Sequence, residues 1–225
     1  MLITVWSPKH GSGVSTIAAA LAIAADRPVR LVDLDEDQSA IFGMACDPIG
    51  GLHEELTASS GEAVWSHAFH VAPHVMLLSR GARAIDALDN AALARHVRAW
   101  QVSDELHIVD AGSADTGAAH ACIDGADISL VVLRPCYLAL RRAVRHGRVA
   151  ESDGLIVIED PDRPLRAREV ADVVQRPILG RVPVRAAIAR AIDAGVFSTR
   201  FPAELRAPVV SALEILGVNR PGRAA

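Results

Sequence analysis

Short apolar runs alternate along this chain with longer segments in which apolar residues recur every three or four positions. Apolar runs of about four to eight residues are typical of buried strands, and the wider spacing is typical of helices that bury one face. The pattern predicts strands at 2–6, 29–33, 75–79, 106–110, 127–133, 154–158 and 178–182. It predicts helices at 17–24, 52–56, 62–67, 86–100, 137–150, 165–174, 186–194 and 202–216, and another that starts near residue 37.

Strands that alternate with helices favour a doubly wound, mostly parallel α/β sheet with helices on both faces. The chain has 225 residues, of which 51% are hydrophobic. A single domain over 1–225 with one large core is therefore expected. Residues 43–74 are the least regular part, because glycines and prolines interrupt them repeatedly.

A glycine-containing segment, Trp-Ser-Pro-Lys-His-Gly-Ser-Gly-Val-Ser-Thr at 6–16, joins the first strand to the first helix. Glycines at 11 and 13 allow a tight turn in which successive N–H groups point at one anion. The N-terminus of the following helix adds a positive partial charge. Strand, glycine loop and helix together predict a phosphate-binding loop. An ordinary glycine-rich turn is the structural alternative.

Residues 9–16 resemble the deviant Walker A motif, K-G-G-x-G-K-T-T, of ParA/MinD-type ATPases. Lys9 stands at the position of that family's signature lysine and is the only lysine in the chain. His10 replaces a glycine of the motif, and Val14 replaces the ordinary P-loop lysine. This pattern is most similar to the CpaE/TadZ branch, which is associated with pilus assembly.

The resemblance implies ATP and Mg²⁺ as ligands. The phosphates would be held by the loop residues Gly11, Ser12, Gly13, Val14, Ser15 and Thr16. Ser15 would also ligate Mg²⁺. Asp33 and Asp110 each end an apolar strand, as carboxylates near a ligand crevice do in α/β folds, and by resemblance both would lie near the Mg²⁺.

Four further positions gain a role from the same resemblance. Asp35 would position the attacking water, although it could instead cap the helix that starts near residue 37. Gly112 would let the γ-phosphate approach the backbone. Pro183 would pack against the base, unless it only closes a turn. Glu159 stands near the position where the family often places an asparagine that reads adenine.

In ParA/MinD relatives the signature lysine reaches across a dimer to the partner's phosphates. Lys9 and Asp35 are therefore the catalytic candidates, and ATP would join two subunits. Because Val14 carries no amine, we expect a slow ATPase or a nucleotide-dependent dimer that barely hydrolyses. If the loop requires a positive φ at His10, that residue would be strained.

Composition limits other classes of function. The chain lacks an uncharged apolar run of about 18 residues and a basic segment ahead of an apolar one, so neither a membrane span nor a signal peptide is expected. Three cysteines without CxxC spacing indicate free thiols in a reducing cytoplasm and argue against an iron–sulfur site: Cys46, Cys122 and Cys136. Four histidines in the irregular part, at 53, 67, 70 and 74, lack the spacing of a metal site.

Charge is unevenly distributed along the chain. Residues 1–133 carry 7 basic and 17 acidic side chains, whereas 134–225 carry 16 and 10. Arginines at 141, 142, 145 and 148 fall in one predicted helix and form either a solvated face or a contact surface.

Three functions remain open from the sequence. The first is a homodimeric ATPase that positions a pilus or secretion machine through a protein partner. The second is a partition ATPase that binds DNA through the arginine-rich second half. The third is a pseudo-ATPase scaffold. A membrane anchor at the C-terminus is not expected, because Pro208 would interrupt the last helix and basic residues there are sparse.

Overall fold

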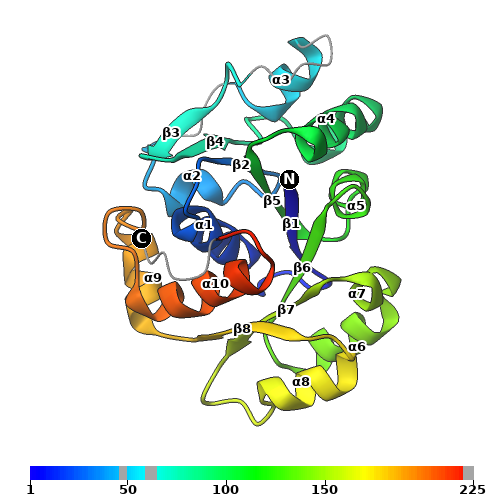
Figure 1. The fold of residues 1–225 in the computed structure, drawn as a ribbon, viewed down its shortest axis with the longest axis vertical. Helices are drawn as coiled ribbons and strands as arrows, with labels where there is room; N and C mark the ends of the chain where they lie inside the picture. The colour runs from blue at the N-terminus through cyan, green and yellow to red at the C-terminus, as the bar shows by residue number, and fades with distance from the viewer. Residues whose placement is uncertain (46–49, 59–64, 220–225) are drawn as a thin grey trace.

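The computed structural model of the chain describes residues 1–45, 50–58 and 65–219 (Figure 1). Within these residues eight strands form one sheet, in the order β3-β4-β2-β5-β1-β6-β7-β8. The strands are β1 (Leu2–Ser7), β2 (Val29–Asp33), β3 (Phe69–Ala72), β4 (Val75–Leu78), β5 (Leu106–Ser113), β6 (Ile128–Leu133), β7 (Gly154–Glu159) and β8 (Ile178–Pro183).

Every neighbouring pair of strands is parallel except β3 and β4, which pair antiparallel at the edge of the sheet. The predicted doubly wound α/β fold is therefore confirmed. β3 was not predicted, because Phe69 and His70 are exposed and the segment lacks an apolar run. Its strand conformation comes from hydrogen bonding to β4 rather than from its own residues.

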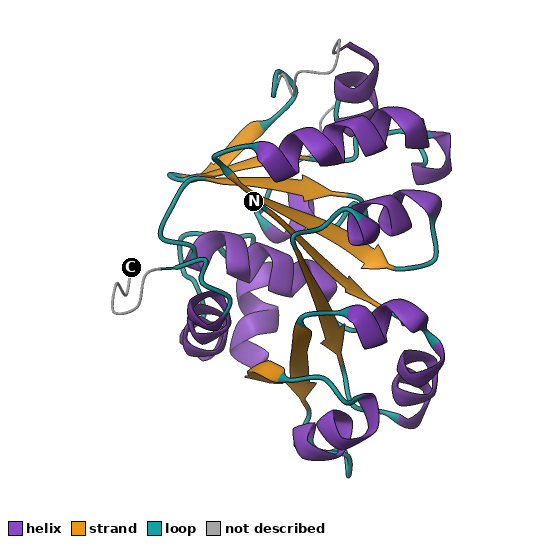
Figure 2. Ribbon diagram, turned by 45° about the vertical axis from the view of Figure 1, so that its right-hand side comes forward, coloured by secondary structure: helices purple, strands orange, loops and turns teal. Residues whose placement is uncertain are grey.

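Helices cover both faces of the sheet (Figure 2). One face carries α1 (Val14–Ala24), α2 (Gln38–Ile41), α9 (Ala186–Asp193) and α10 (Ala203–Ile215). The other carries α3 (Leu52–Ala58), α4 (Asn90–Val102), α5 (Gly117–Asp124), α6 (Tyr137–Arg145), α7 (Gly147–Glu151) and α8 (Ala167–Val174). A short 3₁₀ helix, η1 (Ile85–Ala87), precedes α4.

Helix α1 occupies the centre of the first layer, next to α10 and the sheet (Figure 1). Its alanines at 18, 19, 20 and 22 are fully buried, and so is Leu21. Small side chains let the helix lie close to the strands on one side and to α10 on the other. The N-terminus of α1 is consequently held in a fixed position at the end of β1.

Several predicted helices differ from the structure. The helix predicted at 137–150 is two helices, because His146 has an extended conformation between α6 and α7. The helix predicted at 86–100 begins at Asn90, where the carboxylate of Asp89 accepts the N–H groups of Ala91 and Ala92. α5 was not predicted at all. The helix predicted at 62–67 lies mostly outside the described residues, and 65–67 are not helical.

Pro208 lies inside α10, so the expectation that it interrupts this helix was wrong. A proline in a helix interior costs about 3 kcal/mol. The apolar side of α10 offsets that cost, because Leu205, Val209 and Leu213 are fully buried. Among the described residues, none of the helices combines the length and the apolar character needed to cross a bilayer.

Candidate functional site

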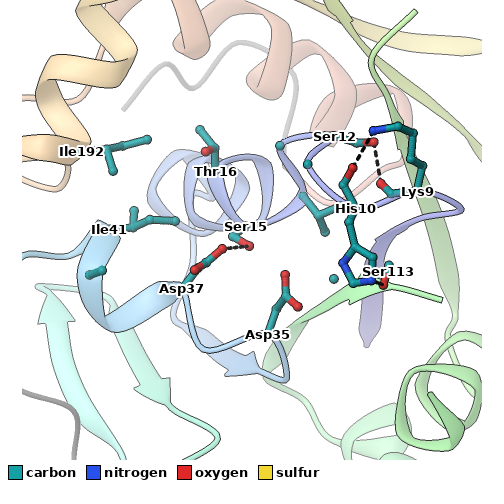
Figure 3. A pocket seen from close by; sticks show the side chains of 15 residues that line it. Lys9, His10, Ser12, Ser15, Thr16, Asp35, Asp37, Ile41, Ser113 and Ile192 are labelled. Atoms are coloured by element: carbon teal, nitrogen blue, oxygen red, sulfur yellow. Dashed lines mark hydrogen bonds between the residues drawn. The ribbon is translucent and has the colours of Figure 1, made fainter. Parts of the chain in front are cut away.

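The site lies where β1, β2 and β5 end. β5 runs between the other two, and its Asp110 is paired with Asp33 of β2, while Ser113 is paired with Ser7 of β1. The loops that follow these strands therefore meet at one edge of the sheet, where ligands bind in open α/β folds. They surround a cavity of about 360 Å³ (Figure 3), which we call the nucleotide cavity after the ligand that the sequence predicts for it. It is lined by residues 9–16, Asp35, Asp37, Ala40, Ile41, Gly112, Ser113 and Ile192.

The loop between β1 and α1 has the conformation of an anion cradle. Gly11 and Gly13 adopt positive φ angles of 70° and 91°, which residues with a Cβ rarely adopt. Gly13 is the N-cap of α1, and neither a capping side chain nor an acidic residue occupies the first turn. Ser12 orders the loop, because its hydroxyl lies 2.7 Å from the carbonyl oxygen of Lys9. The first N–H groups of α1 are thus available to an anion in the cavity.

Lys9 and His10 form the rim of the nucleotide cavity on one side (Figure 3). The Lys9 ammonium donates to the carbonyl oxygen of His10 at 2.9 Å. The Nε2 atom of His10 lies 2.7 Å from Ser113 Oγ and 3.1 Å from Asp115 Oδ2. Backbone strain at His10 was expected if its φ were positive. It is not positive, since the described non-glycine residues with positive φ are Glu36 and Gln175.

Position 14 carries no charge to the phosphate site. Val14 is buried and belongs to the hydrophobic cluster on the α1 face of the sheet. The nearest amine in the chain is that of Lys9, which lines the same cavity. Any neutralisation of a phosphate by lysine must therefore come from Lys9, either of this chain or of another copy.

Asp33 is fully buried, and its two oxygens are occupied by backbone donors. One oxygen accepts the N–H groups of Asp35 and Glu36 at 2.9 Å each, and the other accepts that of Gln38 at 3.1 Å. Asp33 therefore orders the turn that follows β2. Burial raises its pKa well above the usual value, and the neighbouring Asp110 raises that pKa further. Its side chain lies behind the nucleotide cavity rather than in its lining.

Asp110 is also fully buried, and a glutamine connects it to the phosphate loop. Gln38 Nε2 donates to Asp110 Oδ2 at 2.7 Å and to the carbonyl oxygen of Ser15 at 2.9 Å. Burial raises the pKa of Asp110 to about 6, although hydrogen bonds from Gln38 and Ser15 oppose that shift. Gln38 was not predicted as a site residue. A glutamine among acidic residues carries no sequence signal that separates it from a surface position.

Gln38 Oε1 is buried and has no hydrogen-bond partner among the described residues. Exchanging the amide oxygen and nitrogen would not help, because the nitrogen already donates to two acceptors. An unpartnered acceptor beside Ser15 and Asp110 suits a donor such as a metal-bound water. The described residues contain no cluster of three or more His, Cys, Asp or Glu able to hold a metal ion by themselves. A magnesium ion here would thus need oxygens from phosphate and water, as Mg²⁺ usually has.

Asp35 and Asp37 place two carboxylates directly in the cavity lining (Figure 3). Neither acts as a helix cap. The N-cap position of α2 is Asp37 rather than Asp35, and the Asp37 side chain makes no cap hydrogen bond. Asp37 Oδ2 instead lies 3.5 Å from Ser15 Oγ. Burial raises the pKa of Asp35, and Asp37 adds to that rise, while His10 and Arg80 oppose it. Asp37 was not singled out from the sequence, where it is the last of four acidic residues at 33–37.

Gly112 is required by the position of Asp35. Its φ is +57°, and a Cβ placed there would lie 2.5 Å from the Asp35 carboxyl carbon. No side chain fits between the backbone of β5 and this carboxylate. The observed close neighbour of the Gly112 backbone is therefore the Asp35 carboxylate, and the approach of a γ-phosphate to Gly112 stays a prediction.

The opposite end of the cavity is apolar, where Ile41 and Ile192 lie on the far side of Thr16 from Lys9 (Figure 3). Pro183 was predicted to pack against a base, but it pairs with Glu159 at the ends of β8 and β7 and does not line the cavity. Glu159 accepts the N–H of Ala167 at 3.4 Å. Of the other predicted residues, Lys9, 11–16 and Asp35 line one cavity, whereas Asp33 and Asp110 are not part of its lining. What they bind stays a prediction.

Comparisons with known proteins found relatives by sequence and by fold. No protein-family model matches the chain. Two Mycobacterium tuberculosis proteins, both described as uncharacterized (MT3760 of strain CDC 1551 / Oshkosh and Rv3660c of strain ATCC 25618 / H37Rv), are each 28% identical over 236 aligned positions. The alignment spans 100% of this chain and 67% of each relative.

Solved structures of MinD and ParA proteins resemble the whole fold. The septum site-determining protein MinD of Pyrococcus horikoshii, complexed with Mg-ADP, superposes with a TM-score of 0.81 over 96% of this chain and 95% of that chain, at 17% identity. A chain of the MinC:MinD cell division protein complex of Aquifex aeolicus gives a TM-score of 0.78 over 100% of this chain and 99% of that chain, at 20% identity. A ParA family ATPase of Chlorobium tepidum gives 0.78 over 95% and 98%, at 19% identity.

At these identities the likeness establishes the fold. The chain has the α/β P-loop NTPase fold, and its structural neighbours are MinD- and ParA-type ATPases. Function has to be argued from the site itself.

Proposed function

We propose that this chain is a ParA/MinD-type ATPase that binds ATP with Mg²⁺ in the nucleotide cavity and dimerises in response. One observation carries the proposal: the uncapped N-terminus of α1 opens into the cavity that Ser15, Asp35 and Asp37 also line. Free N–H groups are complementary to phosphate, and the oxygens are complementary to a divalent cation. In this proposal 1–225 acts as one NTPase domain in the cytoplasm, where free thiols persist.

Each part of the site then has a role. The phosphates are held by the backbone of Gly11, Ser12, Gly13, Val14, Ser15 and Thr16. Ser15 Oγ would ligate Mg²⁺, Asp110 would hold it through water, and Gln38 Oε1 would accept a hydrogen bond from such a water. Asp33 keeps the turn before Gln38 in register. When bound, Mg²⁺ would neutralise phosphate charge and polarise the phosphoryl group.

Two side chains are left for catalysis. Asp35 accepts a hydrogen bond from the water that attacks the γ-phosphate, and its raised pKa makes it sensitive to the charges around it. Lys9 neutralises the phosphates, in the dimer those of the partner molecule. A charged hydrogen bond contributes about 1.5–3 kcal/mol, so the absence of a lysine at Val14 should slow hydrolysis roughly tenfold to a hundredfold.

The cellular role follows from the motif rather than from the cavity. Lys9 together with Val14 supports placement in the CpaE/TadZ branch, and with it the positioning or regulation of a Tad or type IV pilus system through a protein partner. The arginine-rich second half of the chain keeps a DNA-binding partition ATPase as the alternative. Val14 also leaves open a pseudo-ATPase scaffold.

Calorimetry with ATP and ADP, with and without Mg²⁺, tests nucleotide binding, and light scattering tests dimerisation. We expect Mg²⁺-dependent binding and an ATP-dependent dimer that Lys9→Ala weakens. Arg98→Ala is the matched control, because Arg98 is an exposed cation on α4, on the opposite face of the sheet from α1. Absence of binding at millimolar nucleotide would leave the scaffold as the function. Binding without a dimer would refute the role of Lys9 in a second subunit.

A further inference from the structure

A second hollow lies beside the nucleotide cavity and is larger, at about 540 Å³. Helix α6 forms one wall and the start of the phosphate loop forms another. We call it the α6 groove, and define it by Arg141, Arg142, Arg145, Leu138, His10 and Asp115. His10 lines both hollows, so the groove borders the nucleotide cavity directly.

The arginines of the α6 groove have no acidic partners. Arg141, Arg142 and Arg145 form no ion pair within the described residues, whereas Arg148, just beyond α6, pairs with Asp124. Arg142 donates only to a carbonyl oxygen, that of Pro8, at 3.5 Å. The carboxylate of Asp115 faces His10 at 3.1 Å. A concave wall with uncompensated positive charge attracts and concentrates anionic groups.

The groove also offers apolar surface. Leu138 lines it and is 45% exposed, and on the same helix Tyr137 is 79% and Val144 61% exposed. Exposed aromatic and aliphatic side chains among arginines are typical of protein-binding surfaces. A free phosphate ion would leave Leu138 uncovered, and a flat membrane would not enter a hollow. A protruding chain segment that carries both acidic and apolar side chains matches the charge and the apolar wall together.

We propose that the α6 groove docks an acidic, apolar-bearing segment of a partner protein. The acidic side chains pair with Arg141, Arg142 and Arg145, and an apolar side chain covers Leu138. The docked segment then lies against His10 at the edge of the phosphate loop. This goes beyond the proposed function, because the groove is built from residues that need no nucleotide to be in place.

Fluorescence anisotropy with a labelled peptide of repeated Glu-Glu-Leu units tests the proposal on the nucleotide-free protein. We expect the double variant Arg141→Gln/Arg145→Gln to bind the peptide about tenfold more weakly, since each exposed charge pair accounts for roughly threefold. The matched control is Arg190→Gln/Arg200→Gln, which removes the same charge from a different hollow of about 380 Å³. Its affinity should stay within about twofold of wild type. Equal losses in both double variants would overturn the proposal.

Peptide composition and Leu138 provide an independent check. Repeated Gln-Gln-Leu should bind at least about tenfold more weakly than Glu-Glu-Leu, because it lacks the charges. Leu138→Ser should weaken Glu-Glu-Leu but leave Glu-Glu-Ser unchanged, because only the first peptide has a side chain to cover Leu138. Equal effects on both peptides would show that Leu138 makes no contact.

Other occupants are distinguished in the same assay. Duplex DNA that binds more tightly than the peptide, with the same dependence on Arg141 and Arg145, would assign the groove to nucleic acid instead. Co-sedimentation with phosphatidylglycerol vesicles, without peptide binding, would assign it to a membrane surface. A wild-type dimer that the Arg141→Gln/Arg145→Gln variant converts to monomer would assign it to self-association. Each of these results overturns the proposal.

Discussion

Asp110→Asn should stabilise the nucleotide-free protein while weakening its response to Mg²⁺ and ATP. Asp110 is fully buried, is paired across the strands with Asp33, and accepts hydrogen bonds from Gln38, Ser15 and the Gly112 N–H, while no cation among the described residues pairs with it. A buried carboxylate without a cation is costly in its charged form. Replacing it with a neutral amide of the same shape removes that cost, and also removes the charge that would hold Mg²⁺.

The size of the effect follows from the pKa. Burial raises the pKa of Asp110 from 3.8 to about 6. A difference of about two units corresponds to roughly 3 kcal/mol, at 1.36 kcal/mol per unit. The asparagine cancels part of this gain in stability. Its NH₂ group must face at least one of the groups that donate hydrogen bonds to the carboxylate, and this costs about 1 kcal/mol. We expect a net gain of about 1–2 kcal/mol, or roughly 2–8 °C in melting temperature.

The direction of the pKa shift determines whether stability rises or falls with pH. The folded pKa of Asp110 lies above its unfolded value, so the native state binds more protons between about pH 4 and pH 6. This group therefore stabilises the fold less as pH rises through that window, and its full cost is present above it. The advantage of Asp110→Asn should be smallest near pH 4 and complete by about pH 7.

Urea unfolding of wild type and variant at a series of pH values measures this difference. Asp124→Asn is the control, because Asp124 is half-exposed, pairs with Arg148 and has a lowered pKa, so its loss should destabilise slightly. In a thermal assay, Mg²⁺ with ATP should raise the melting temperature of wild type more than that of Asp110→Asn. An Asp110→Asn protein that is less stable than wild type at pH 8 would refute the reasoning.

Three other predictions follow from burial and backbone geometry. Burial lowers the pKa of His107 to about 4, so stability should fall by up to about 3 kcal/mol as pH drops from 6.5 through 4, and His107→Gln should remove that part of a urea-unfolding pH profile. Gly112→Ala should displace Asp35 and lower the free energy of unfolding by about 1–3 kcal/mol, measured by thermal unfolding. ATP hydrolysis by this variant at the wild-type rate would contradict the role of Asp35. Gly43→Ala should cost more than about 2 kcal/mol by the same assay, because its Cβ would lie 2.4 Å from the Gly195 carbonyl oxygen, whereas Gly147→Ala, in open space, should stay within about 0.5 kcal/mol.

Local pattern was sufficient for the framework of the site. The strand before the phosphate loop, the glycines with positive φ and the helix after it depend on spacing within about fifteen residues. Asp33 and Asp110 were found for the same reason, since each ends an apolar run. Their meeting at one site follows from a general rule, because the carboxyl ends of parallel strands lie at the same edge of a sheet.

Tertiary contacts decided what the individual side chains do. Gln38 connects Ser15 with Asp110 through two hydrogen bonds. Asp110 is 72 positions from Gln38 in the sequence, and no local feature predicts the hydrogen bond between them. The oxygens of Asp33 accept N–H groups of the turn after β2, which the sequence did not indicate, and its place near a metal stays a prediction. Pro183 was expected at the base, but it ends a strand outside the cavity.

The unbroken α10 has a tertiary explanation. Pro208 reads as a helix breaker in the sequence, yet burial against α1 and β8 keeps α10 continuous. The sequence by itself therefore determined the order of most strands and helices, β3 and α5 excepted, and which residues end the central strands, because those depend on local periodicity. The partners of each polar group were decided only when distant strands and helices packed together, because a buried donor or acceptor takes whichever partner the fold brings within reach.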